Sequence, residues 1–121
     1  MIKKPDKNKE RKQRAMRTAD IHGTAKKPRL CVYRSLLHVY AQLVNDDLGK
    51  TLVAVNTKQK DIAKLVKGKP KQAQSFIVGQ QLAKAALAKK IKEVVFDRSG
   101  YVYHGRIAQV AEGARDGGLK F

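Results

Sequence analysis

Residues 30–55 read LCVYRSLLHVYAQLVNDDLGKTLVAV, and this stretch sets the architecture of the chain. It contains three runs of apolar and β-branched residues, which predict strands at residues 30–33, 38–44 and 51–55. The cluster Asn45-Asp46-Asp47-Leu48-Gly49, typical of a turn, separates the second run from the third. Strands with such short connections are antiparallel neighbours, so we predict a three-stranded meander.

The middle strand of this meander has one apolar face and one polar face. Successive residues of a strand point to opposite sides of the sheet, so alternate positions share a face. The apolar set, which we expect to pack inward, is Val39, Ala41 and Leu43. The polar set, which we expect to face solvent or a partner, is His38, Tyr40 and Gln42. The preceding strand is apolar on both faces.

The segment after Pro70 predicts a helix that packs on this sheet. Proline suits the first turn of a helix, and apolar side chains recur at helical spacing over residues 72–89. Gly79 weakens such a helix by about 1 kcal/mol relative to alanine, and we expect it to allow a close approach to the sheet. The predicted apolar stripe is Ala73, Phe76, Ile77, Ala83 and Leu87, with Ile91 just beyond it.

A short strand and a second helix follow. Val94-Val95-Phe96 is typical of a strand covered on both faces, and the order strand, helix, strand predicts a parallel pairing. The last helix is predicted over residues 106–116, and Gly117-Gly118 ends it. Its apolar positions are Ile107, Val110, Ala111 and Ala114.

The predicted order is therefore β-β-β-α-β-α, an α/β fold in which helices pack on a mixed sheet. Residues 29–121 form one domain, in which residues 57–71 are a lysine-rich connector. Residues 1–28 form a basic N-terminal arm. Good helix formers over residues 7–19 favour a helix in the arm. In free solution we expect this helix to be only marginally stable, because its like charges repel one another.

The chain carries a large excess of positive charge. Its 121 residues include 27 Lys and Arg against 10 Asp and Glu, for a net charge of +17. Residues 1–29 alone hold eleven basic and three acidic residues. Counterion release from phosphates makes nucleic acid the expected partner of such a surplus. The alternatives are a solvated tail and an anchor for anionic membranes, although the arm lacks the Trp, Phe or Leu stripe that would insert.

Composition argues against several other classes of protein. No apolar stretch approaches the roughly 18 residues that span a bilayer, and we expect no secretory signal because no apolar run follows Lys3 and Lys4. Cys31 is the only cysteine, which excludes an internal disulfide and suits a reducing compartment. It has no zinc-ligand spacing to any histidine, so we expect a buried, inert thiol, no metal site and no cofactor.

Catalysis finds no support in the sequence. Metal-dependent phosphoryl transfer needs several acids that converge on a cation, as in a nuclease. The candidate acids are scattered over turns, the connector and strand ends: Asp46, Asp47, Asp61, Glu93 and Asp97. Ser99 lacks the strained elbow of a hydrolase nucleophile, and the glycines do not have the spacing of a nucleotide-binding loop. We therefore expect no enzyme activity.

The segment DRSGYVYHGR at residues 97–106 concentrates groups that bind nucleic acid. Ligands of open α/β sheets bind at loops that follow strands. Arginine forks onto phosphate or guanine, tyrosine stacks on bases, and glycine lets backbone amides approach closely. Tyr101 and Tyr103 point the same way if the segment is extended. In the competing interpretation the tyrosines pack on the sheet and Asp97 caps a turn, which explains the arginines less well.

Four runs of sequence resemble a known family. They are KPRLCVYRS at 27–35, HVYAQ at 38–42, VVFDRSGYVYHGR at 94–106 and AEGARDGGLKF at 111–121. These runs are similar to bacterial-type ribosomal protein L18 (uL18), including its plastid versions. The resemblance implies a truncated ribonuclease H-like fold and a structural role in the large ribosomal subunit, in the cytoplasm or the plastid stroma. It also implies binding to 5S rRNA and attachment of that RNA to 23S rRNA in the central protuberance, beside ribosomal protein L5 and other proteins of that region.

The resemblance further implies RNA-binding positions. They are Arg11, Arg14, Arg17, Lys26, Lys27, Arg29, Arg34, Ser35, His38, Tyr40, Arg98, Ser99, Gly100, Tyr101, Tyr103, His104 and Arg106. Leu36-Leu37 departs from the family, which usually has polar or basic residues in that turn. The alternative function is a general nucleic-acid-binding architectural protein. The chain has no helix-turn-helix or zinc-finger signature, and the aromatic and arginine residues of 98–106 suit folded RNA better than a uniform duplex.

Overall fold

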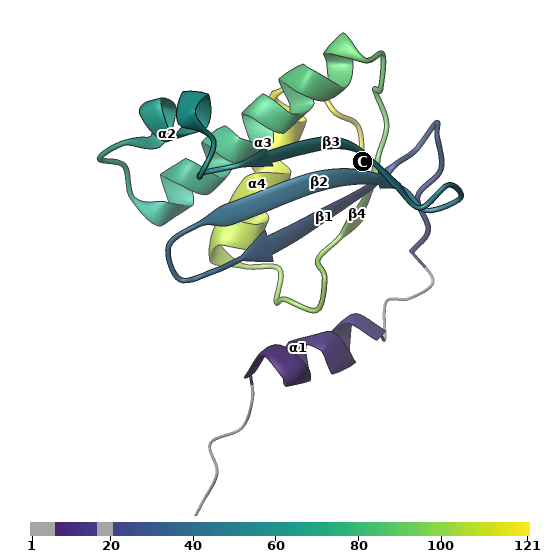
Figure 1. Cartoon of the computed structure of the whole chain (residues 1–121), viewed down its shortest axis with the longest axis horizontal. Coiled ribbons are helices and arrows are strands. Elements are labelled where there is room, and N and C mark those ends of the chain that lie inside the picture. Colours follow the sequence, from purple (N-terminus) through teal and green to yellow (C-terminus); the bar gives the residue numbers. More distant parts are fainter. Residues whose placement is uncertain (1–6, 17–20) are drawn as a thin grey trace, which may run out of the picture.

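The structure is a computed structural model that describes residues 7–16 and 21–121 (Figure 1). The strands in these ranges are β1 (Arg29–Arg34), β2 (Val39–Asn45), β3 (Lys50–Asn56) and β4 (Val95–Asp97). The helices are α1 (Lys7–Met16), α2 (Lys60–Val66), α3 (Lys71–Ala88) and α4 (Gly105–Asp116). The predicted α/β class and the predicted order of strands and long helices are confirmed, with α2 as an additional short helix.

Within the described residues the strands form one mixed sheet in the order β3-β2-β1-β4. β1 pairs antiparallel with β2, and β2 pairs antiparallel with β3, which confirms the predicted meander. β4 pairs parallel with β1, with Leu30 opposite Phe96, which confirms a parallel pairing. Because β1 and β4 run in the same direction, the segments that follow these two strands lie at the same end of the sheet.

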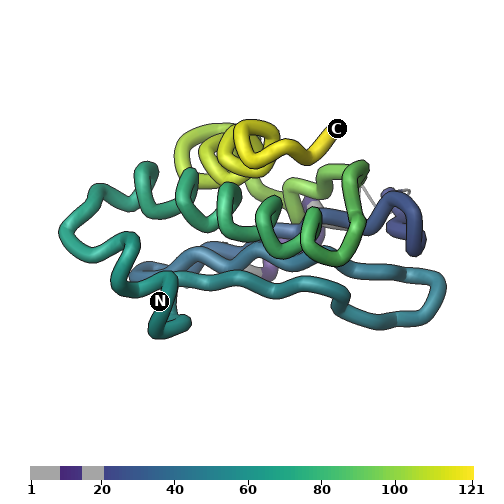
Figure 2. The backbone as a smooth tube through the Cα atoms, turned by 90° about the horizontal axis from the view of Figure 1, so that it is seen from above, coloured from purple at the N-terminus to yellow at the C-terminus, as the bar shows by residue number. Residues whose placement is uncertain are grey.

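Helices α3 and α4 cover one face of the sheet, as Figure 2 shows. The core between the two layers consists of side chains that are at most 1% exposed: Leu30, Val32, Val39, Ala41 and Leu43 from the sheet, and Val78, Leu82, Ile107 and Val110 from the helices. The inward face predicted for β2 is therefore confirmed. On the opposite face, Cys31 is partly buried and Tyr33 is 44% exposed, so β1 is fully buried on one face only.

The two long helices approach each other closely at a pair of glycines. A β-carbon on Gly79 would lie 2.7 Å from the backbone nitrogen of Ala114. One on Gly113 would lie 2.9 Å from the carbonyl carbon of Phe76. Both distances are shorter than an ordinary van der Waals contact. Gly79 thus allows a close approach to α4, and the expectation that it brings α3 close to the sheet is wrong.

The buried face of α3 also differs from the predicted stripe. Phe76 and Ile77 are only partly buried, and Leu87 is 39% exposed. The residues that are buried are Ser75, Val78, Gly79, Leu82, Ala83 and Ala86. α3 contacts the sheet on one side and α4 on another. Small residues therefore line the contact between α3 and α4, and larger side chains lie at the margins of that contact. The stripe predicted for α4 is confirmed, since Ile107, Val110, Ala111 and Ala114 are all buried.

The ends of both long helices have the same hydrogen-bonded geometry. After α3, the Ile91 N–H donates to the Ala86 carbonyl, and Lys90 takes a left-handed conformation with a φ of 64°. After α4, Gly118 takes the equivalent position with a φ of 111°, which confirms the predicted stop. Glycine is the usual residue at this position because it has no β-carbon to clash.

Two predictions about smaller elements are wrong. The connector at residues 57–71 contains α2, in which Ile62 and Val66 lie one turn apart and are buried. β4 is not fully covered on both faces, because Val95 and Phe96, which point to opposite faces, are each only partly buried. In the two described ranges, no helix is long and apolar enough to cross a membrane.

Candidate nucleic-acid interface

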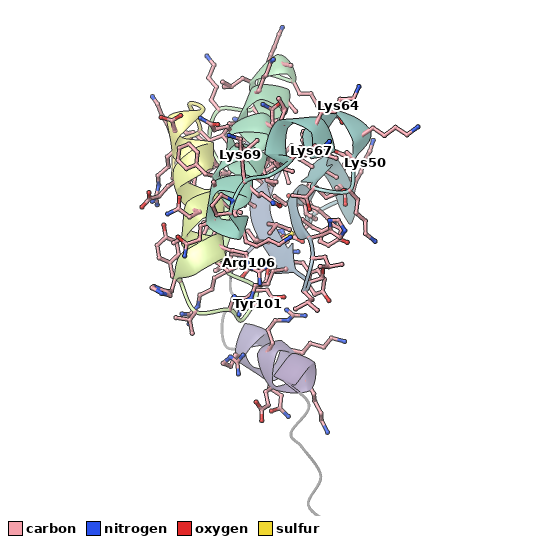
Figure 3. All side chains as sticks on the ribbon, turned by 90° about the vertical axis from the view of Figure 1, so that its left-hand side faces the viewer. Lys50, Lys64, Lys67, Lys69, Tyr101 and Arg106 are labelled. Atoms are coloured by element: carbon pink, nitrogen blue, oxygen red, sulfur yellow. The ribbon has the colours of Figure 1, made fainter. Side chains whose placement is uncertain are left out.

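One end of the sheet brings together the loop that follows β4 and the turn that follows β1. The Tyr101 hydroxyl lies 3.3 Å from both the backbone nitrogen and the carbonyl oxygen of Arg34. Arg106 Nη1 donates to the Ser35 carbonyl at 3.1 Å. Figure 3 shows Tyr101 and Arg106 near each other at this end of the body. We call residues 34–38 and 98–106 the basic edge.

A tight turn fixes the first half of the loop. Ser99 and Gly100 have φ values of 56° and 83°, and the Tyr101 N–H donates to the Arg98 carbonyl at 3.0 Å. Two consecutive residues with positive φ inside this hydrogen bond are typical of a type I′ turn. The Asp97 carboxylate accepts the Ser99 N–H at 2.8 Å, so Asp97 caps the turn as the competing interpretation predicted.

Tyr101 and Tyr103 differ in their surroundings. Tyr101 is 9% exposed and belongs to the hydrophobic core. Its ring lies near two guanidinium groups, with Arg11 at 5.0 Å and Arg34 at 5.2 Å from the ring centre. Tyr103 is 43% exposed and packs edge-on against Phe96. The segment is not an extended strand, so the two tyrosines do not form one exposed pair.

Arg29 is held by two carboxylates. Its guanidinium bonds Asp46 at 2.9 Å and Asp97 at 2.9 Å, so it ties the β2–β3 turn to the end of β4. The hydrogen bond from Arg29 lowers the pKa of Asp46 and raises the pKa of Arg29 itself. Two of the acids considered for a nuclease thus converge on an arginine. Among the described residues, no group of three or more His, Cys, Asp or Glu side chains is placed to hold a metal ion.

The basic edge carries exposed basic side chains and the start of a helix. Arg34, Arg98 and His104 are exposed, and Lys71 Nζ donates to the Leu37 carbonyl at 2.7 Å. α4 begins within the edge, and α3 begins beside it at Lys71. Neither helix has an acidic residue in its first turn or a side-chain cap. Uncapped N–H groups and the helix dipole attract anions, so this end of the molecule suits phosphate.

Helix α1 contacts the same loop through two arginines. Arg11 Nη1 donates to the Ser99 carbonyl at 2.7 Å, and Arg14 Nε donates to the Gly100 carbonyl at 2.9 Å. These are the two residues with positive φ in the turn, so α1 holds the turn from outside. In Figure 1, α1 lies below the body, next to this loop. The predicted helix over 7–19 is confirmed up to Met16, and residues 17–19 lie outside the described residues.

Beside the basic edge, the uncovered face of the sheet has a shallow hollow of about 190 Å³. The rings of Tyr33 and Tyr40 form part of its lining, with centres 5.8 Å apart. Arg11 lies over Tyr33 at 5.5 Å from the ring centre. Cys31 also lines the hollow, and burial raises the pKa of its thiol. We call this feature the tyrosine hollow; its lining is Arg11, Arg29, Cys31, Val32, Tyr33, Tyr40, Gln42 and Ser99.

The structure gathers most of the predicted RNA-binding positions, but not all of them. The positions on the basic edge are Arg34, Ser35, His38, Arg98, Ser99, Gly100, Tyr101, Tyr103, His104 and Arg106; Tyr40 lies beside it, and Arg11 and Arg14 contact it from α1. Lys26 and Lys27 precede the other end of β1, where Lys27 pairs with Glu93 at 3.7 Å. Arg17 lies outside the described residues.

Sequence reasoning missed Tyr33 as part of this surface and gave Lys71 no individual role. Tyr33 pairs directly with Tyr40 across β1 and β2. The alternation of Tyr33 with Leu30 and Val32 was the available signal, because it places Tyr33 on the outer face of the sheet. Lys71 was hidden among the other lysines of the connector. Three of these, Lys64, Lys67 and Lys69, are exposed and are labelled on the face seen in Figure 3.

The fold and this surface define a small, strongly basic α/β protein of the nucleic-acid-binding class. Residues 3–121 match the family model described as ribosomal L18 of archaea, bacteria, mitochondria and chloroplast. The chain therefore belongs to the ribosomal L18 family, as the four sequence runs indicated.

Curated relatives agree with this assignment. The chain is 54% identical to large ribosomal subunit protein uL18 of Chlorobaculum parvum over 110 residues, which cover 91% of each chain. It is 51% identical to the uL18 protein of Limosilactobacillus reuteri, and 50% identical to that of Thermosipho africanus, over 100% of each chain. Family membership makes this chain a ribosomal structural protein of the bacterial type, and its relatives are not enzymes.

Proposed function

We propose that this chain binds 5S rRNA in the large ribosomal subunit and helps attach it to 23S rRNA in the central protuberance. Ribosomal protein L5 and other proteins of that region are its expected neighbours. The observation that carries the proposal is the basic edge, which contains exposed Arg34, Arg98 and His104 together with the uncapped start of α4. The bacterial relatives favour ribosomes of the cytoplasm over those of a plastid.

The geometry of the loop supports recognition of a folded RNA. The type I′ turn, the buried Tyr101 ring and the bond from Arg106 to Ser35 fix the loop before any ligand binds. A preorganised loop loses less conformational entropy on binding. Side chains at fixed spacing then contact phosphates of one particular RNA shape, while the cations of the arm neutralise further phosphates.

A titration at several salt concentrations tests the proposal. The protein is titrated with 5S RNA and with duplex DNA of equal length. We expect tighter binding to 5S RNA and a different dependence of log K on log salt for the two ligands. Equal affinity and equal slope would instead support the alternative, a general nucleic-acid-binding architectural protein, and would overturn the proposal.

A pair of matched variants locates the contact. Arg98→Ala removes one exposed cation of the basic edge, whereas Lys84→Ala removes one exposed cation of α3 away from it. A neutralised phosphate contributes about 0.7–0.9 to the salt slope, so Arg98→Ala should reduce the slope by about that amount. Lys84→Ala should leave it unchanged, and both variants should keep the thermal stability of the parent protein. Equal slopes for the two variants would place the contact elsewhere.

Deletion of residues 1–20 tests the role of the arm. The deletion removes Arg11 and Arg14, which contact the loop, together with the other cations of that segment. We expect weaker binding to 5S RNA and a flatter dependence on salt, because fewer phosphates are neutralised. Circular dichroism checks that the remaining body is folded. An unchanged slope would exclude the arm from RNA contact.

A further inference from the structure

The tyrosine hollow differs in chemistry from the basic edge beside it. The edge presents cations and a helix start, which suit phosphates. The hollow instead presents aromatic surface, since Tyr33 is 44% exposed and Tyr40 is partly exposed. Among the described residues, the hydroxyls of Tyr33 and Tyr40 and the side-chain amide of Gln42 make no hydrogen bond within the chain. Arg11 covers part of the Tyr33 ring, and a ligand can meet the remaining aromatic surface of the two tyrosines together with these unused polar groups.

The dimensions and shape of the hollow suit one flat ring. Its volume of about 190 Å³ is roughly six times the ~30 Å³ that a water molecule occupies in the liquid. The planes of Tyr33 and Tyr40 are inclined by 43°, so together they form an angled floor rather than a flat platform. A base pair or a duplex cannot lie in such a hollow, because only one ring system at a time can contact both tyrosines.

The groups around this floor match the parts of a nucleotide. A base can stack on the ring of a tyrosine through its flat face. Such stacking depends little on the nucleotide sequence, because every base has an aromatic face. The amide of Gln42 provides donors and an acceptor for the edge of a base. Arg11, whose guanidinium lies over Tyr33, places positive charge at the rim, where the phosphate of the same nucleotide would lie.

We propose that the tyrosine hollow binds a single unpaired nucleobase of RNA. This proposal rests on the proposed function, because an RNA already held at the basic edge would present that base to the adjoining sheet face. An acidic peptide would use the arginines but not the aromatic floor, and an anionic membrane would need an apolar stripe that this face lacks.

Cys31 provides a direct measurement of occupancy. It is the only cysteine of the chain and it lines the hollow next to Tyr33. Burial raises the pKa of its thiol, so alkylation is slow and is best followed at mildly alkaline pH. A base seated on the tyrosines would cover the thiol, and the alkylation rate would fall.

The test compares three samples of the full chain treated with iodoacetamide: without RNA, with a short single-stranded RNA, and with an RNA duplex of the same length. Both RNAs are used at concentrations that saturate the protein. We expect the single-stranded RNA to slow alkylation of Cys31 severalfold and the duplex to leave the rate near that of the free protein. Equal protection by both RNAs, or protection by neither, would overturn the proposal.

Variants of Tyr33 separate stacking from charge. Tyr33→Ala should weaken binding of the single-stranded RNA by about fivefold to a hundredfold, the range for loss of one stacked base, and should abolish the protection of Cys31. Tyr33→Phe should retain both. Because Tyr33 lies on the uncovered face, neither variant should unfold the protein. If 5S RNA binds normally but Cys31 is not protected, the nucleobase proposal fails and the proposed function stands. If Cys31 is protected but 5S RNA is not preferred, the nucleobase proposal stands and the proposed function fails.

Discussion

The contact between α3 and α4 gives a quantitative prediction for Gly113→Ala. The added β-carbon would lie closest to the carbonyl oxygen of Phe76, with the carbonyl carbon at 2.9 Å and the Cα at 3.1 Å. These neighbours are backbone atoms, which cannot rotate away as a flexible side chain can. Restoring an ordinary contact with the oxygen requires the helices to separate by about 1 Å.

That separation determines the expected loss of stability. A gap of about 0.5–1 Å removes a quarter to a half of the dispersion energy of each contact, and each contact contributes about 0.1–0.2 kcal/mol. Over the tens of atom pairs between two packed helices the loss is about 1–3 kcal/mol, the usual range for overpacking. Alanine regains up to about 1 kcal/mol of helix propensity. We therefore expect a net destabilisation of about 1–2 kcal/mol and a Tm lower by about 10 °C.

Urea unfolding followed by circular dichroism measures this change. Glu112→Ala is the matched control, because Glu112 is the exposed neighbour of Gly113 on α4 and its replacement should change stability by less than about 0.5 kcal/mol. Gly79→Ala should behave like Gly113→Ala, and the double variant should cost less than the sum, since one separation relieves both clashes. A Gly113→Ala protein as stable as the parent would refute the reasoning.

Three further predictions follow from other parts of the structure. Tyr101→Phe should lower the free energy of unfolding by about 1 kcal/mol, because the buried hydroxyl contacts the backbone of Arg34. RNA affinity in a filter-binding assay should be nearly unchanged. The control is Tyr103→Phe, at an exposed position, which should lower stability less. Lys90→Gly should raise stability by about 0.5–1 kcal/mol in urea unfolding, because it relieves a positive φ, and no gain would contradict the left-handed geometry. The lowered pKa of Asp46 stabilises the folded state above the unfolded carboxyl value of about 3.9. That contribution should be lost as pH falls through the folded value, so Asp46→Asn should be less stable at neutral pH and less sensitive to acid.

Local patterns were sufficient to predict the elements whose environment is simple. The alternation of Val39, Ala41 and Leu43 identified the buried face of β2, because only one side of that strand is covered. The spacing of Ile107 and Val110 identified the buried face of α4 for the same reason. The α2 helix was missed because its two buried residues lie among lysines, which dominate the local hydropathy.

Features that depend on contacts between distant segments could not be predicted from local patterns. The role of Gly79 depends on Ala114, which is far away in sequence and lies on another helix. Tyr101 is buried because its hydroxyl reaches the backbone of Arg34, and Arg29 is neutralised because Asp46 and Asp97 converge on it. Tyr101 and Arg29 each had a plausible role in RNA binding when considered alone, and Gly79 had a plausible role against the sheet. Its partner could be identified only after the strands had been placed.

Helices cover only one face of the sheet, so odd- and even-numbered residues of β2 lie in different environments. Val39, Ala41 and Leu43 belong to the folding core, whereas Tyr40 and Gln42 belong to the open side. A saturation mutagenesis scan should therefore show two separate kinds of sensitivity along one strand. Changes at odd-numbered positions should reduce the yield of folded protein, and changes at even-numbered positions should leave the yield intact but alter incorporation into ribosomes. Substitutions on the open face can then adapt the protein to a changed RNA partner without destabilising the fold.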